Sequence, residues 1–297
     1  MKVLVTGANG LLGQELIAAL LERKHEVIAT SKGPSRIKTD AGSSITYREL
    51  NITDGLAIQQ VLAETRPEVI IHAAAMTQVD DCELDKITCY NINVTATRFL
   101  VEAAKEVGAR LVYISTDFIF DGEAGPYKED DEPKPVNYYG STKLSAEAEI
   151  MESGLPWSIV RTVLVIGTAV GTRSNIISWV RDKLTRGEKI KVVDDQFRTP
   201  TFTEDLAKGI VLVVEKKATG IYHISGKDFL TPYQIALKTA DHFGLDHSLI
   251  EKADVTSFSQ PAVRPPRTGF YIDKARKDLG YEPLSFDEAL KKFFPIA

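Results

Sequence analysis

The chain has 297 residues, 43% of them hydrophobic and 26% charged, which are ordinary values for a globular protein with one large domain or a large and a small one. Its formal net charge of -5 argues against a nucleic-acid partner, because contact with a phosphate backbone needs a basic surface. No apolar run approaches the ~20 residues of a membrane span, and the N-terminal residues do not resemble a signal peptide, so we expect no membrane association and a cytoplasmic location.

The first part of the chain alternates between short β-branched runs and longer segments of helical period. Such alternation is typical of a parallel sheet covered by helices on both faces. The expected fold class is therefore α/β, with a Rossmann-like, doubly wound parallel sheet. We predict strands over residues 2–6, 26–30, 45–49, 69–72, 110–115 and 157–162, and helices over residues 11–23, 55–65, 85–107 and 139–152.

The pattern becomes looser after residue 162. Glycine and threonine cluster at residues 167–172, and a proline-rich stretch covers residues 260–267. We predict a dinucleotide-binding domain over residues 1–162, to which residues 203–224 return. Residues 163–297 are expected to form mainly a smaller substrate-binding region.

Two further features are interpreted as structural. Cys82 and Cys89 are too few for a disulfide framework, and no cysteine or histidine pair in the sequence has the spacing of metal ligands. We expect two reduced, half-buried thiols and no metal. The acidic run at residues 129–132 is expected to be a solvated loop.

A glycine-rich turn joins the first predicted strand to the first predicted helix, where residues 7–13 read GANGLLG. Glycine here allows positive φ and lets backbone N–H groups approach a pyrophosphate, to which the helix N-terminus adds partial positive charge. Three glycines alone are weak evidence, since any tight strand-to-helix turn favours them. Their place in the first βα unit of a parallel-sheet pattern favours a dinucleotide site.

The residues after the second predicted strand indicate which dinucleotide is bound. NAD-selective sites usually place a carboxylate there for the ribose 2′-hydroxyl. This chain has Ser31 and Lys32, then Arg36, and no carboxylate before Asp40. A hydroxyl followed by cations suits a 2′-phosphate, so we expect NADP. If the basic residues form only a solvated loop, NAD is the alternative.

Tyr139 and Lys143 stand at i and i+4 of a predicted helix and so share one face. An ammonium one turn away favours the phenolate, so Lys143 is expected to lower the pKa of Tyr139 and make it a proton shuttle for a carbinol oxygen. Thr116 and Asp117 follow the strand at 110–115, where a hydroxyl could hold a substrate carbonyl. The plain alternatives are chance spacing of the Tyr–Lys pair and simple turn capping by Thr116 and Asp117.

Five stretches together resemble the extended short-chain dehydrogenase/reductases. They are TGANGLLG from Thr6, HAAAMTQVDDCE from His72, NINVTAT around Asn93, STDFIFDG from Ser115 and YYGSTK from Tyr138. Within that superfamily the sequence is similar to the dTDP-4-dehydrorhamnose reductases, whose substrate-side motifs resemble VDDQFRTPT at residues 193–201 and the later Arg264–Pro265. The likeness spans nearly the whole chain.

The resemblance implies roles for individual residues. Tyr139 would be the proton donor, Lys143 would also bind the nicotinamide ribose, and Thr116 would align the substrate with Asp117 beside it. Asn93 would be structural. The expected cofactor contacts are Gly7, Asn9, Gly10, Leu11, Leu12, Ser31, Lys32, Asn51, Ile52, Ala73, Ala74, Ala75, Tyr139 and Lys143.

Besides Thr116 and Asp117, the expected substrate contacts are Leu164, Asn175, Arg198, Arg264 and Arg267. The three arginines are expected to clamp a diphosphate, since guanidinium groups bind phosphate oxygens bidentately, although one of the three is expected to be simply solvated. Four positions depart from the family pattern. Leu164 replaces a usual tryptophan, Asn51 an aspartate, Arg198 a small residue and Arg267 an asparagine. Three of these positions, all but Asn51, lie on the substrate side, so the sequence does not determine which sugar is bound.

The expected function is the NADP(H)-dependent reduction of the C4 keto group of a nucleotide-activated deoxysugar. One alternative is another nucleotide-sugar reductase, epimerase or dehydratase, although dehydratases commonly need an acid/base pair near Thr116 and Asp117–Phe118 supplies at most half of one. The other is a non-catalytic regulatory subunit, as in the methionine adenosyltransferase β subunit, which looks related. The intact Tyr139–Lys143 pair argues against that reading. The sequence also leaves a homodimer open.

Overall fold

The computed structural model describes residues 1–38, 43–172 and 174–296, so Asp40 lies outside the described residues. Seven parallel strands form one sheet in the order β10-β6-β5-β4-β1-β2-β3. The chain order reverses between β1 and β4, and ligands of doubly wound folds bind beyond the carboxyl ends of the strands at such a point. The strands are β1 (Lys2–Thr6), β2 (Glu26–Ser31), β3 (Ile45–Glu49), β4 (Val69–His72), β5 (Arg110–Thr116), β6 (Trp157–Thr162) and β10 (Gly220–His223).

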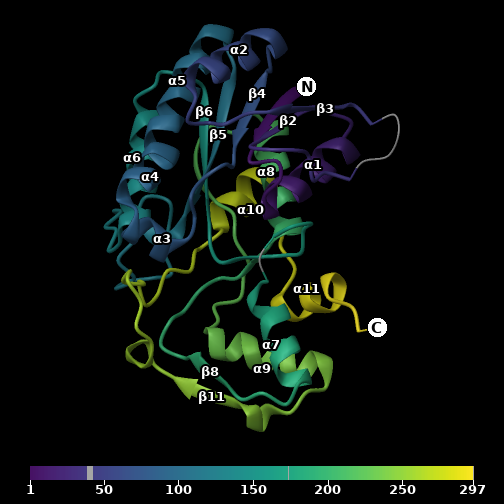
Figure 1. The fold of residues 1–297 in the computed structure, drawn as a ribbon, viewed down its shortest axis with the longest axis vertical. Coiled ribbons are helices and arrows are strands. Elements are labelled where there is room, and N and C mark those ends of the chain that lie inside the picture. Colours follow the sequence, from purple (N-terminus) through teal and green to yellow (C-terminus); the bar gives the residue numbers. More distant parts are fainter. Residues whose placement is uncertain (39–42, 173, 297) are drawn as a thin grey trace.

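Helices cover both faces of this sheet (Figure 1). Successive strand residues bury on opposite faces, so Val3 and Val5 join one apolar cluster and Leu4 joins the other. The predicted fold class, an α/β Rossmann-like doubly wound sheet, is therefore confirmed. On the first face lie α1 (Leu11–Glu22), α8 (Thr203–Glu215) and α10 (Asp273–Leu279), and on the second α2 (Gly55–Thr65), α5 (Ala96–Val107) and α6 (Tyr138–Met151).

A smaller lobe lies beyond the carboxyl edge of the sheet (Figure 1). Two apolar clusters form its interior, one around Phe202 and one around Val180. Residues 203–224 leave this lobe and supply α8 and β10 to the main sheet. The lobe contains α7 (Ile176–Thr185), α9 (Pro232–Phe243), α11 (Phe286–Phe293) and two short parallel sheets, β7 (Val165–Ile166) with β9 (Thr201–Phe202) and β8 (Ile190–Val193) with β11 (Ile250–Ala253).

No helix among the described residues is long and apolar enough to cross a membrane. The same part of the chain also contains three short 3₁₀ turns. The turns are η2 (Asp117–Ile119), η3 (His247–Leu249) and η4 (Val255–Ser257).

The single helix predicted over residues 85–107 is wrong in detail. The structure has α3 (Val79–Leu84), α4 (Lys86–Tyr90) and then a π-helical turn, η1 (Asn91–Thr95), before α5 begins. The side-chain amide of Asn93 exchanges two hydrogen bonds with the backbone of Met76, at 2.8 and 3.1 Å. The π-helical turn occurs where the polar side chain of Asn93 makes these bonds. The spacing of apolar residues gives no sign of such bonds, so it could not predict the turn.

The acidic run at residues 129–132 is also not wholly solvated. Glu129 is half-buried, and its Oε1 accepts a hydrogen bond from the backbone N of His223 at 3.0 Å. Burial raises the pKa of this carboxyl above its ordinary value. Glu129 therefore ties its loop to the end of β10.

A buried ion pair joins α6 to β6 and generates a prediction about stability. Two bonds connect Arg161 and Glu147, at 2.7 and 3.1 Å, and their side chains are 3% and 0% exposed. Glu147→Ala leaves the Arg161 guanidinium buried without a carboxylate, with only its bond to the carbonyl of Glu129, so we expect the free energy of unfolding in urea to fall by about 3–5 kcal/mol.

The matched control is Glu149→Ala on the same helix, whose pair with Arg98 lies at the surface. That substitution is expected to cost less than about 1 kcal/mol. Equal losses for the two variants would contradict the structural role of the buried pair.

Candidate active site

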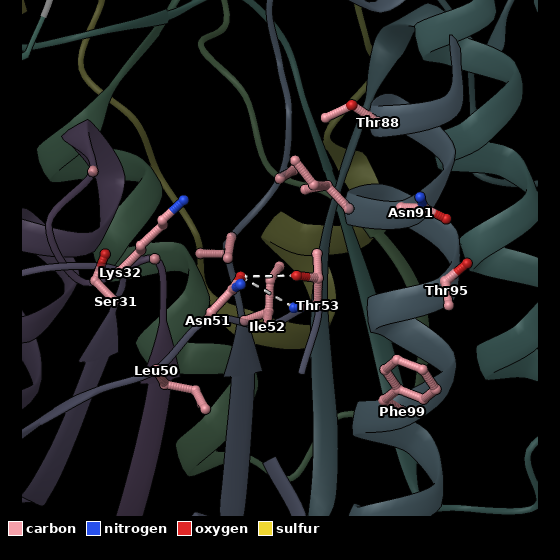
Figure 2. A pocket seen from close by; sticks show the side chains of 16 residues that line it. Ser31, Lys32, Leu50, Asn51, Ile52, Thr53, Thr88, Asn91, Thr95 and Phe99 are labelled. Carbon is pink, nitrogen blue, oxygen red and sulfur yellow. Dashed lines mark hydrogen bonds between the residues drawn. The ribbon is translucent and has the colours of Figure 1, made fainter. Parts of the chain in front are cut away.

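A cavity of about 840 Å³ opens beyond the carboxyl ends of β1, β2 and β4. Its volume is in the range of small-molecule sites. Figure 2 shows Ser31 and Lys32 on one side of it and Asn91, Thr95 and Phe99 on the opposite wall. The lining residues are Gly7, Gly10, Ser31, Lys32, Leu50, Asn51, Ile52, Thr53, Ala73, Ala74, Ala75, Thr88, Asn91, Ile92, Thr95 and Phe99.

The cavity brings together most of the residues predicted for the cofactor. The predicted residues that do not line it are Asn9, Leu11, Leu12, Tyr139 and Lys143, and those it adds are Leu50, Thr53, Thr88, Asn91, Ile92, Thr95 and Phe99. The motif NINVTAT marks part of this added wall. The π-helical turn changes which of its side chains face the cavity, so a regular helical period could not identify them.

The glycine turn fits a dinucleotide pyrophosphate. Gly7 has a φ of 75°, and a Cβ there would lie only 2.8 Å from the backbone N of Ala74, so glycine is required for this close approach. No side chain caps α1 at Gly10. The backbone N–H groups of Leu11 and Leu12, in the first turn of α1, are therefore available to an anion. These two leucines would act through their backbone, since the side chain of Leu12 packs against the core.

Asn9 has a structural role that the sequence did not reveal. Its Oδ1 accepts the backbone N–H of Arg36 at 2.9 Å, and its Nδ2 donates to the carbonyl of Pro34 at 2.9 Å and the hydroxyl of Tyr47 at 3.1 Å. One buried amide thus joins the glycine turn to the basic loop that follows β2. This loop contains Lys32.

Tyr139, Lys143 and Thr116 meet at the carboxyl end of β5, the strand beside β4. Lys143 is buried, and its Nζ donates to the carbonyl of Ile114 at 2.7 Å and lies 4.1 Å from the centroid of the Tyr113 ring. Burial lowers the pKa of Lys143 to about 7. Burial also raises the pKa of Tyr139 above its ordinary value, while the Thr116 hydroxyl acts in the opposite direction.

The expectation that Lys143 lowers the pKa of Tyr139 is therefore wrong for this arrangement. The ammonium bonds to a backbone carbonyl, and the burial of Tyr139 dominates its ionisation. The raised pKa favours the protonated phenol near neutral pH.

Asp117 is anchored inside the protein rather than presented to a ligand. It is 3% exposed, its Oδ1 accepts from the Thr116 hydroxyl at 3.1 Å, and its Oδ2 accepts from the Thr268 hydroxyl. The Nε of Arg198 lies 3.8 Å from the same carboxylate. Burial raises the pKa of Asp117, and the Arg198 guanidinium opposes that rise. The Asp117 carboxylate is thus held by partners within the protein, and its contact with substrate stays a prediction.

The three predicted arginines are not equivalent. Arg198 is 5% exposed, and its guanidinium donates to the carbonyls of Phe197, Pro265 and Pro266. Buried backbone acceptors and Asp117 already engage the Arg198 guanidinium, and its contact with a diphosphate stays a prediction.

Arg264 and Arg267 differ from one another as well. Arg264 pairs with Asp80, with Nη2 at 2.7 Å from Oδ2. The exposed Arg267 has no carboxylate partner among the described residues, and its guanidinium lies 4.8 and 5.3 Å from the ring centroids of Phe197 and Phe229. Of the three, Arg267 is best arranged to meet an anionic ligand.

Leu164 and Asn175 also lie on the side of the smaller lobe. Leu164 follows β6, is 37% exposed and has a φ of 33°, a strained value for leucine. Asn175 caps α7, since its Oδ1 accepts the backbone N–H of Ser178 at 3.0 Å and its Nδ2 donates to the carbonyl of Gly167 at 2.6 Å. The amide predicted to contact substrate is therefore engaged in capping.

Residues 1–296 match the family model described as the RmlD substrate binding domain. The chain belongs to this family. It is 34% identical over 302 residues to dTDP-4-dehydrorhamnose reductase of Streptomyces griseus, which covers 98% of this chain and 92% of that protein. It is 32% identical over 253 residues to methionine adenosyltransferase 2 subunit beta of Xenopus laevis, covering 83% of this chain and 73% of that protein.

The fold is likewise similar to a solved member of the family. The crystal structure of dTDP-4-dehydrorhamnose reductase from Bacillus anthracis in complex with NADP superposes with a TM-score of 0.86 at 30% identity, covering 99% of this chain and 98% of that one. The resemblance to extended short-chain reductases is thereby confirmed. The RmlD-like family consists of NAD(P)-dependent nucleotide-sugar reductases and their homologues.

Burial of Lys143 generates a prediction about pH. Its pKa is about 7 in the folded protein and ~10.4 in an unfolded chain, so between these values the unfolded state binds more protons and stability rises with pH. Relative to Lys143→Met, wild type should therefore gain stability as the pH rises from about 7 to about 10. Urea unfolding across this range measures the difference.

The control is Lys105→Met, at an exposed position of α5. It is expected to leave the pH dependence as in wild type. If the difference in unfolding free energy between wild type and Lys143→Met stays constant with pH, burial does not lower the pKa of Lys143.

Proposed function

We propose that this protein reduces the C4 keto group of a nucleotide-activated deoxysugar with NADPH, as a dTDP-4-dehydrorhamnose reductase-like enzyme. The observation that carries the proposal is the convergence of Tyr139, Lys143 and Thr116 at the end of β5. β5 neighbours β4, which is followed by the alanines that line the dinucleotide cavity. A proton donor thus stands one strand away from the cofactor site.

NADPH would supply a hydride when bound in the cavity. Conversion of a ketone to an alcohol also consumes one proton, which the neutral phenol of Tyr139 donates to the carbonyl oxygen. Thr116 would hold that oxygen beside the phenol, and its own hydroxyl is kept in place by the Oδ1 of Asp117. Lys143 would bind the nicotinamide ribose, the role that the resemblance to the family implies.

The preference for NADP over NAD is supported by the residues around the cavity. Ser31 and Lys32 line it at the end of β2, and none of its described lining residues is acidic. A hydroxyl and an ammonium suit a 2′-phosphate, whereas NAD-selective sites place a carboxylate there. The solved Bacillus anthracis relative is in complex with NADP.

A regulatory subunit is the second candidate. The observation that favours it is the 32% identity to methionine adenosyltransferase 2 subunit beta. Arg267 beside two aromatic rings also provides an anion-binding feature without requiring catalysis. The two candidates differ in turnover, because a regulatory subunit would bind a dinucleotide without consuming it.

Replacement of Tyr139 by phenylalanine tests the catalytic proposal. The substitution removes the proton donor but keeps the ring, so kcat should fall by about 10²-fold or more while the Kd for NADPH changes little. Steady-state rates with a dTDP-activated 4-keto sugar and calorimetric titration with NADPH provide the two measurements.

The neighbouring Tyr138→Phe is the matched control, since it removes a phenolic hydroxyl one residue away. It is expected to retain kcat within about threefold of wild type. Full turnover by the Tyr139→Phe protein would overturn the assigned proton donor.

A further inference from the structure

Residues 167–172, here called the strap, connect the smaller lobe to the glycine turn. Gln14, in the first turn of α1, bonds to Val170 twice, because its Nε2 donates to the carbonyl at 3.0 Å and its Oε1 accepts the backbone N–H at 3.1 Å. The same Nε2 donates to the carbonyl of Asn9 at 3.0 Å. One side chain therefore contacts both the strap and the turn that would hold the pyrophosphate.

The strap makes a second contact, with the basic loop after β2. The Nη1 of Arg36 donates to the carbonyl of Gly171 at 3.0 Å. Gly171 has a φ of 70°, and a Cβ there would lie 3.0 Å from that same nitrogen. The backbone of Arg36 is fixed in turn by Asn9, as described above. The strap is thus in contact with the loop that carries the cations predicted to distinguish NADP from NAD.

The other end of the strap is fixed to the smaller lobe. The carbonyl of Gly167 accepts a hydrogen bond from the capping residue of α7, Asn175, and a Cβ at Gly167 would lie only 2.1 Å from the Oγ1 of Thr203. These two contacts fix Gly167 beside the cap of α7. The strap physically links the cofactor side of the crevice to the N-terminus of α7.

We propose that Arg36 couples the two sides: it binds the 2′-phosphate of NADP while keeping the carbonyl of Gly171, so that NADP, and not NAD, holds the strap closed over the glycine turn. A guanidinium has five N–H donors in a fixed plane and can serve a phosphate and a carbonyl together. Closure of the strap keeps the cap of α7 in place on the nucleotide-sugar side. Arg36 is in this sense a positioning residue, and the inference rests on the proposed NADP(H) site.

The strap has the properties of a segment that opens easily. Val170 is 46% exposed, and the bonds that fix residues 170 and 171 to the main domain come from the side chains of Gln14 and Arg36. Such segments exchange their amide hydrogens by local opening, so a ligand that stabilises the closed strap slows the exchange. The amide of Val170 reports this directly, because it donates to Gln14.

Amide hydrogen exchange of residues 167–172 tests the proposal. Adenosine 2′,5′-bisphosphate carries the 2′-phosphate but neither nicotinamide nor sugar, and 5′-AMP lacks the 2′-phosphate. At saturation we expect the bisphosphate to slow exchange of the strap by about fivefold or more, the lower end of typical coupling between sites, and 5′-AMP to have no such effect. Arg36→Ala should abolish the difference between the two ligands.

Lys38→Ala is the matched control, because it removes one positive charge from the same exposed loop. It should retain the protection by the bisphosphate. Equal protection by both ligands, or undiminished protection in Arg36→Ala, would overturn the role of Arg36. Calorimetric titration separates this failure from a wider one: ligands that bind without protecting the strap contradict only the coupling, whereas absence of any binding of NADP contradicts the proposed function as well.

Discussion

One buried carboxylate joins the main domain to the C-terminal half of the chain. Asp117 directly follows Thr116 at the end of β5, yet its partners Thr268 and Arg198 come from the C-terminal half of the chain. Asp117 is 3% exposed, and burial of an ionised carboxyl costs several kcal/mol unless the group is paired and hydrogen-bonded. Separation of these segments would leave the carboxylate without its partners. Next to Thr268 the segments also pack closely, since a Cβ at Gly125 would lie 2.0 Å from the carbonyl oxygen of Arg267.

Burial away from water also shifts the pKa values of Tyr139 and Lys143. Burial favours the neutral forms of both Tyr139 and Lys143, raising one pKa and lowering the other. A neutral phenol is the form required to give a proton to a carbonyl oxygen. Tyr139 is buried against Cys82, Cys89 and Phe118, so the residues that exclude water from its phenol belong to the main domain.

Much of this was predictable from the sequence, because its signals are local. The signals are the short β-branched runs, the glycine turn and the i, i+4 placement of Tyr139 and Lys143. They depend on neighbouring residues and predict the sheet, the place of the cavity and a shared helix face for the two side chains. The hydrogen bonds of Arg198 and Asn175, by contrast, form with partners that only the fold brings near. The spacing of residues in the sequence does not show whether a guanidinium already has such partners. The π-helical turn at Asn93 and the strap contacts of Gln14 and Arg36 arise in the same way from long-range bonds.

The most direct test of the account is the consumption of NADPH by the purified protein in the presence of dTDP-4-dehydro-6-deoxy-L-mannose. We expect NADPH to be oxidised in step with formation of the C4 alcohol, and NADH to support a lower kcat/KM. Tight binding of NADPH without oxidation, in the presence of this sugar nucleotide and of other 4-keto sugar nucleotides, would contradict the central claim and favour a regulatory role.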